Sequence, residues 1–220
     1  MLTDPKEIEI ISRARQANVR DPRRSRKHFE AIYDDFLREL AWPGRVVLDI
    51  GPGHYDLGEI LKARGAAVEG VDNDPAVLEL GRYKGYRAIE GNLRRLGEID
   101  FGRRYHGLFC KLSLNAFWSA SSAALEEDVG RLLDLGSADA WLWIAPWNGV
   151  PKDLDARSPR VAEMLDAQRR AFRARGCDVF ELPEELTLRY GIHGVTANRA
   201  LFTRAVRIPE ALERYRAKAA

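Results

Sequence analysis

The chain has 220 residues, of which 45% are hydrophobic and 31% are charged, and its formal net charge at pH 7 is +2. This length suits one full-sized domain, and the composition is that of a globular chain with a continuous core. A nearly neutral charge gives no case for a nucleic-acid or membrane partner, and no apolar run reaches the roughly 18 residues of a membrane span.

Residues 1–44 are predicted to be a helical segment of the same domain, because apolar residues recur at helical spacing between positions 29 and 40. Pro43 and Gly44 end this segment. Short apolar runs and helical patterns then alternate. Strands are expected at 46–50, 67–71, 87–90, 105–114 and 139–146, and helices at 57–64, 75–83, 122–135 and 158–175.

Three further strand-like runs, at 177–181, 187–190 and 200–207, are separated by turns, and 209–220 is expected to be a helical tail. The alternation predicts an α/β fold over 45–208, with a doubly wound, mostly parallel sheet and helices on both faces. The late switch to consecutive strands predicts an antiparallel hairpin at one edge. Cys110 and Cys177 lie in apolar runs and are expected to be buried thiols, as in a soluble cytoplasmic protein.

The most informative stretch is the strand 46–50 and the turn after it, where Asp49, Gly51 and Gly53 follow one another closely. Glycine lets the backbone turn sharply and lets a ligand approach closely. In a doubly wound sheet this turn lies at the carboxyl edge, where ligands bind, and an acid ending the next strand, here Asp72, can accept hydrogen bonds from a ribose diol.

Two cofactor classes use such a turn. A nicotinamide site expects a third small residue in G-x-G-x-x-G, but that position is Asp56 here. An acid there is also poorly placed beside a pyrophosphate, because like charges would meet. The residues therefore weigh against a nicotinamide cofactor.

The run VVLDIGPGHYDLGEIL, followed by AAVEGVDNDP and AIEGNL, resembles the class I S-adenosylmethionine-dependent methyltransferases. The resemblance covers about residues 46–146 and implies a Rossmann-like sheet of seven strands, with the N-terminal helices as a lid. It implies S-adenosylmethionine as the cofactor. The cofactor-binding residues would be Asp49, Gly51, Gly53, His54, Asp72, Asn73, Asn92, Leu93 and Lys111.

Within that set, the resemblance assigns Asp49 to the methionine amino group, Asp72 to the ribose hydroxyls and Asn92 to the adenine amino group. Asn92 fits a simple turn equally well. Two positions depart from the family pattern: Tyr55 replaces the common third glycine, which tightens the pocket or changes the path of the loop, and His106 replaces an acid.

The four histidines, His28, His54, His106 and His193, are candidate general bases, and His54 and His193 are the best placed. Each also fits a structural role. No pair of histidines has metal-ligand spacing, so no metal is predicted. His28, Tyr33 and Phe36 would lie on the lid.

Four tryptophans follow strand four or lie in and after strand five. Trp141 and Trp143 are expected in the core, whereas Trp118 and Trp147 fit pocket lining and packing equally. The basic run at 20–27 fits a solvated helix entry better than an RNA-binding patch.

The function predicted is methyl transfer to an unidentified, small-molecule acceptor. Alternatives are a non-catalytic binding module that keeps the cofactor fold, an RNA methyltransferase that uses 20–27, and a nicotinamide oxidoreductase. The sequence gives no oligomeric state.

Overall fold

The computed structural model describes residues 2–23, 26–114, 119–146, 158–192 and 198–218. Within these residues, seven strands form one sheet in the order β3-β2-β1-β4-β5-β7-β6. In that order the strands are β3 (Arg87–Glu90), β2 (Ala67–Asp72), β1 (Val46–Ile50), β4 (Tyr105–Lys111), β5 (Gly136–Ala145), β7 (Ala200–Arg204) and β6 (Asp178–Glu181).

Strands β1 to β5 pair in parallel, and β7 is antiparallel to both β5 and β6. This arrangement confirms the predicted mostly parallel sheet with an antiparallel edge pair. Because they are parallel, β1 to β4 have their carboxyl ends at one edge of the sheet, which we call the carboxyl edge. The predicted fourth strand was too long, because Leu112 has a left-handed φ of 65° and stops it.

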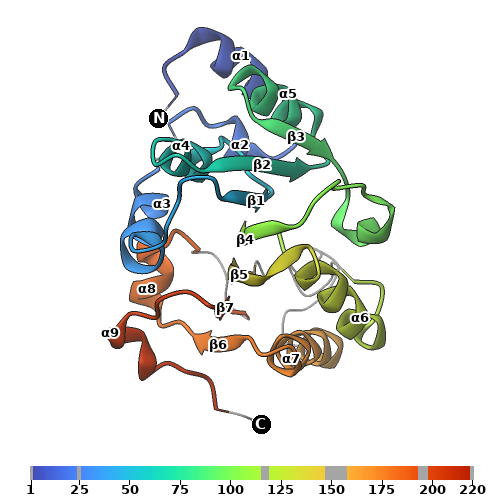
Figure 1. Ribbon diagram of the computed structural model, residues 1–220. Coiled ribbons are helices and arrows are strands. Elements are labelled where there is room, and N and C mark those ends of the chain that lie inside the picture. Colours follow the sequence, from blue (N-terminus) through green and yellow to red (C-terminus); the bar gives the residue numbers. More distant parts are fainter. Residues whose placement is uncertain (1, 24–25, 115–118, 147–157, 193–197, 219–220) are drawn as a thin grey trace.

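Helices cover both faces of the sheet (Figure 1). They are α1 (Pro5–Ser12), α2 (Ala17–Arg20), α3 (Lys27–Ile32), the π-helix η1 (Tyr33–Leu37), α4 (Asp56–Lys62), α5 (Pro75–Tyr83), the 3₁₀ helix η2 (Leu93–Glu98), α6 (Ser122–Leu133), α7 (Pro159–Ala174), α8 (Glu184–Arg189) and α9 (Glu210–Glu213). The sheet separates two apolar cores. The first core gathers residues of α1, α3, α4, α5, α8 and α9, and the second core gathers those of η2, α6 and α7.

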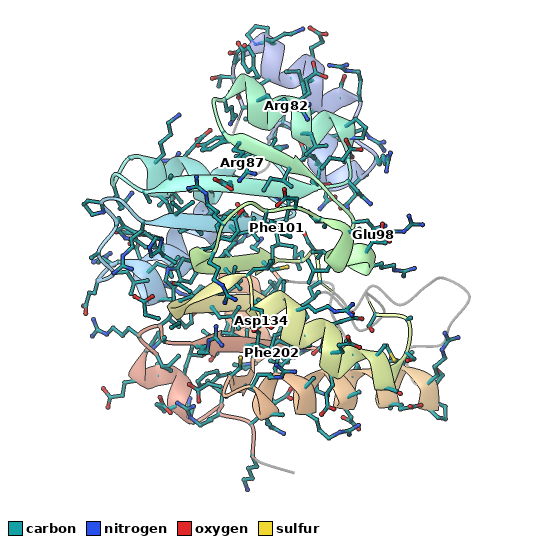
Figure 2. All side chains as sticks on the ribbon, turned by 45° about the vertical axis from the view of Figure 1, so that its right-hand side comes forward. Arg82, Arg87, Glu98, Phe101, Asp134 and Phe202 are labelled. Atoms are coloured by element: carbon teal, nitrogen blue, oxygen red, sulfur yellow. The ribbon has the colours of Figure 1, made fainter. Side chains whose placement is uncertain are left out.

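Alternate side chains of each strand enter the two cores. On β4, Phe109 packs in the first core, whereas Leu108 and Cys110 pack in the second. Phe202 of β7, labelled in Figure 2, stacks on Phe172 of α7 with ring centroids 4.1 Å apart. The period of two along buried strands places each neighbouring side chain on the opposite face.

The N-terminal segment is not one continuous helix. Helix α1 lies antiparallel to α5, because Tyr83 donates a hydrogen bond to Asp4 at one end and the backbone N–H of Arg15 donates to Asp74 at the other. The chain then crosses the carboxyl edge, and α3 with η1 descends along the first core. In Figure 1 this path runs from α1 at the top through α2 to α3.

The strand expected at 187–190 was wrong, because this run belongs to α8. Glu184 and Glu185 stand in the first turn, where acids favour a helix, and Pro183 precedes them. In the described part of the tail, residues 209–218, only α9 is helical. Beyond it, Tyr215 O accepts the N–H of Glu181, and the N–H of Ala217 donates to Val179 O. The tail thus pairs with the open edge of β6.

Candidate functional site

The carboxyl edge brings the segments of the predicted cofactor site together. Asp49 lies in β1, beside β2 and β4, and is 2% exposed. Asp72 ends β2, Asn92 follows β3, and Lys111 ends β4. Because these strands are parallel neighbours, residues far apart in the sequence share one edge.

The turn after β1 requires its glycines. Gly51 has φ of 69° and Gly53 has φ of 56°, both in the left-handed region. The N–H of Gly51 bonds to Val71 O at 2.9 Å, which holds the turn against β2. A Cβ on Gly51 would lie 1.8 Å from the Ser113 hydroxyl, so the segment after β4 approaches the turn as closely as a bare backbone permits.

Tyr55 occupies the third position of the glycine pattern and keeps its left-handed conformation, with φ of 62°. Its ring is fully buried and stacks on Tyr86 with centroids 4.8 Å apart. A Cβ on Gly70 or Gly81 would lie 2.6 Å or 2.1 Å from the Tyr55 side chain. The ring therefore fills an interior slot between β2 and α5.

Asp72 is the acid of the second strand. Its Oδ1 accepts the backbone N–H of Asp74 at 2.8 Å. The pKa of Asp72 is raised above its usual value, chiefly by burial and also by the charge of Asp74. Hydrogen bonds from the backbone N–H groups of Asp74 and Asn73, and the charge of Arg15, offset part of this rise. Asn73 beside it is exposed. The carboxylate keeps further lone pairs for hydroxyl donors.

Asn92 caps η2, because its Oδ1 accepts the N–H of Arg94 at 3.0 Å. This is the turn role that the sequence allowed. The oxygen has a second lone pair, so the predicted contact with an adenine amino group is compatible with the cap. Leu93, the next residue, is half-buried against the second core.

Lys111 has a buried side chain at the end of β4. Its Nζ lies 4.6 Å from the ring centroid of Phe29, on α3. Phe29 also packs against Phe109, with centroids 6.1 Å apart. These contacts place the first turn of α3 at the carboxyl edge.

The described histidines have different surroundings. His54 is 1% exposed, and its Nε2 lies 2.6 Å from Val19 O, so the ring joins the glycine turn to α2. His106 accepts the N–H of Val46 on Nδ1, at the opposite edge of the sheet. His28 bonds through Nδ1 to Arg189 O at 3.1 Å. His193 lies outside the described residues, and both catalytic assignments stay predictions.

Two of the three residues expected on the lid, Tyr33 and Phe36, are core residues, whereas His28 is half-buried. Tyr33 is buried near Trp42, and Phe36 packs against Trp143 and Tyr190 with centroids 6.2 Å and 5.6 Å away. Trp141 and Trp143 are buried, as predicted. Trp118 and Trp147 lie outside the described residues. The parts of the segment that border the carboxyl edge are residues 14–19 and the first turn of α3.

Three described arginines of the basic run at 20–27 have partners within the chain. Arg20 donates to Ala14 O and Arg15 O, Arg23 pairs with Asp21, and Arg26 pairs with Glu30 and Glu59. In the described ranges, no group of three or more His, Cys, Asp or Glu residues is placed to hold a metal ion. A search of the same ranges finds no helix long and apolar enough to cross a membrane.

Comparisons by sequence find no matching family model and no match among curated proteins. Solved structures do match. DesVI of Streptomyces venezuelae aligns with a TM-score of 0.53 at 14% identity, over 95% of this chain and 100% of that one. The sugar N-methyltransferase KedS8 of Streptoalloteichus aligns with a TM-score of 0.52 at 15% identity, over 96% of this chain and 95% of that one.

A third match is CalS10 of Micromonospora echinaspora, an amino pentose methyltransferase, with a TM-score of 0.51 and 18% identity over 82% of this chain and 91% of that one. The chain has the class I methyltransferase fold. The structure of CalS10 holds S-adenosylmethionine. In this methyltransferase fold the sheet order and the antiparallel edge pair agree with the resemblance found in the sequence.

The sequence did not indicate the crossing at residues 14–19. Arg15 and Val19 contact Asp74 and His54 through backbone atoms, and a backbone contact leaves no mark on residue type. Asp74, which holds the Arg15 end of this crossing, is a buried acid that also caps α5.

Proposed function

We propose that the protein is an S-adenosylmethionine-dependent methyltransferase with a small-molecule acceptor. The observation that carries this proposal is the joint placement of Asp49, Gly51, Gly53 and Asp72 at the carboxyl edge of a methyltransferase fold. The left-handed glycines give a ligand access to the backbone, and Asp72 offers carboxylate lone pairs at the end of the neighbouring strand.

These residues fit the cofactor's chemical groups. Asp72 would accept the ribose hydroxyls, Asn92 the adenine amino group, and Asp49 would face the methionine ammonium directly or through water. His54, Asn73, Leu93 and Lys111 border the same edge. When bound, S-adenosylmethionine supplies a methyl group on a positively charged sulfur. The sulfur departs as a neutral thioether, so no acid is needed to assist the leaving group.

The remaining task of the chain is to hold an acceptor in line with that methyl group and to exclude water. The segment after β4, which touches Gly51 through Ser113, borders the place where an acceptor would enter. A general base is needed only when the nucleophile carries a proton at neutral pH. His54 and His193 stay the candidates for that role. A small-molecule acceptor is favoured because KedS8 and CalS10 are named as sugar and amino pentose methyltransferases.

Isothermal titration tests the cofactor assignment. We expect wild-type protein to bind S-adenosylmethionine and S-adenosylhomocysteine with micromolar affinity, and not NAD. Asp72→Ala should weaken both by at least tenfold, because a charged hydrogen-bond acceptor contributes about 1.5–3 kcal/mol. Glu90→Ala is the matched control, since Glu90 is an exposed acid opposite Asp72 in β3.

Absence of adenosyl binding in the wild type would reject the methyltransferase assignment, and NAD binding instead would favour an oxidoreductase. Once binding is established, transfer of a labelled methyl group to amino sugars and other small amines and alcohols tests the acceptor class. Incorporation into RNA alone would favour the alternative that uses residues 20–27.

A further inference from the structure

Lys84, at the end of α5, places a buried charge beside the glycine turn, residues 51–55. It is the C-cap of α5, where its backbone N–H donates to Leu80 O. Its side chain is only 7% exposed. Its Nζ donates a hydrogen bond to the carbonyl oxygen of His54 at 3.1 Å, although the two lie 30 residues apart in the sequence. The end of α5 therefore reaches the turn after β1.

Two acids also surround the Lys84 ammonium. Glu59 of α4 accepts a hydrogen bond from it, and a carboxylate oxygen of Glu7 in α1 lies 3.6 Å away. An ammonium has three N–H donors, and a charge withdrawn from water needs partners that offset its lost hydration. The two acids supply the opposite charge. The bond to the neutral carbonyl of His54 is a further contact, and it ties the cation to the glycine turn.

The His54 carbonyl belongs to a constrained peptide group. Gly53 before it and Tyr55 after it both have a left-handed φ, of 56° and 62°. A left-handed backbone costs a non-glycine residue free energy, so the peptide between His54 and Tyr55 needs contacts that hold it. Lys84 binds the oxygen of this peptide, and Pro52 O accepts its N–H at 2.9 Å. Both polar atoms of the peptide group are therefore fixed.

We propose that Lys84 is a positioning residue of the cofactor site, which acts on the glycine turn through the His54 carbonyl. This inference rests on the proposed function, which assigns the methionine end of S-adenosylmethionine to Asp49 and the turn after it. The adenosine end is assigned to Asp72 and Asn92. A turn that is held in place before the ligand arrives loses less conformational entropy on binding. Lys84 should therefore matter for the methionine end and not for the adenosine end.

Isothermal titration with two ligands separates this role from a general effect on the fold. S-adenosylhomocysteine contains both ends, whereas methylthioadenosine lacks the amino-acid end. The variants are Lys84→Met, Glu59→Gln and the double variant Lys84→Met/Glu59→Gln, in which the partner acid of the lysine is neutralised as well. Lys62→Met is the matched control, because Lys62 is an exposed lysine of α4 that bonds to the backbone oxygen of Lys84.

We expect Lys84→Met to weaken S-adenosylhomocysteine binding by about tenfold or more, the effect of one charge-assisted hydrogen bond, and methylthioadenosine binding by less than about twofold. The step from Glu59→Gln to the double variant should show the same pattern. Lys62→Met should bind both ligands as wild type does. A loss of stability alone leaves the ratio of the two affinities unchanged, because it lowers the binding-competent fraction equally for both ligands.

A loss for methylthioadenosine at least as large as that for S-adenosylhomocysteine would overturn the inference and assign Lys84 a structural role only. Failure of both Lys84 variants to fold would do the same, and unchanged binding of both ligands would remove any role at the site. Wild-type protein that does not bind S-adenosylhomocysteine would instead reject the proposed function. The two failures are therefore distinguishable in one data set.

Discussion

Tyr55 shows how one residue can break a family pattern without breaking the turn. Its backbone adopts the left-handed conformation that glycine adopts at low cost. Its ring lies in the interior slot beside Gly70 and Gly81. A left-handed backbone costs a non-glycine residue roughly 1–2 kcal/mol. Burial of a large aromatic ring, about 3–5 kcal/mol by the cost of its removal, outweighs that strain.

We therefore expect Tyr55→Gly to destabilise the protein by about 2–4 kcal/mol, because the empty slot costs more than the strain it relieves. Tyr55→Phe should be neutral or stabilising by up to ~1 kcal/mol, since the buried hydroxyl has no hydrogen-bond partner among the described residues. Urea unfolding measures both. A loss of more than 2 kcal/mol in Tyr55→Phe would mean that the hydroxyl is bonded.

The two cysteines are expected to be inert in the native protein. Burial raises the pKa of the Cys110 thiol to about 12 and that of Cys177 to about 11. The thiolate is the reactive form, so its fraction at pH 8 is about a thousandth or less for either residue. Iodoacetamide at pH 8 should label neither thiol while the chain is folded, and both in urea. Rapid native labelling of Cys177 would show that the amino end of β6 opens.

At the scale of elements, the C-terminal tail protects the sheet. Strand β6 is the outer strand on this side, and unpaired edges invite association with other chains. Residues 215–217 cover that edge through the hydrogen bonds to Glu181 and Val179, and Leu212 of α9 is buried beneath.

Truncation after Pro209 should therefore lower the free energy of unfolding by about 3 kcal/mol or more, from the burial of Leu212 and the lost edge hydrogen bonds. It should also make the protein associate in a concentration-dependent way. Urea unfolding and light scattering over a dilution series test this. As a control, Arg214→Ala alters an exposed ion pair in the same tail and should change neither. A truncated chain that stays as stable as the full chain contradicts the edge pairing.

Elements could be predicted from the sequence where local signals and tertiary packing agree. The runs at 46–50 and 87–90 matched their strands, and the helix expected at 75–83 matched α5, because helix caps and buried apolar runs act locally. The run at 187–190 misled because Thr187 and Leu188 fit a strand as well as a helix, and the helix signals stand before the run, at Pro183, Glu184 and Glu185. The crossing at residues 14–19 could not be predicted, because backbone atoms make its contacts to Asp74 and His54.

At the scale of the molecule, the N-terminal segment contributes to the core, whether or not it also acts as a lid over the cofactor site. Phe29 packs on Phe109, and Phe36 packs on Trp143, so α3 and η1 cover the centre of the sheet on one face. Trp143 and Phe109 themselves stack at 4.9 Å and are fully buried. Without the segment, these rings would meet water.

Removal of residues 2–40 should accordingly abolish cooperative unfolding. The free-energy cost of exposing these aromatic rings to water should exceed the free energy of unfolding of a typical domain, about 5–15 kcal/mol. Near-ultraviolet circular dichroism and a urea titration measure this. Removal of residues 2–9 alone, which ends before the buried Ile10 and Ile11, is the milder control and should keep a cooperative transition. A cooperative transition in the larger deletion would mean that residues 41–220 fold without the segment and that the segment acts purely as a lid. Loss of cooperativity would mean that the cofactor site and the core share this segment.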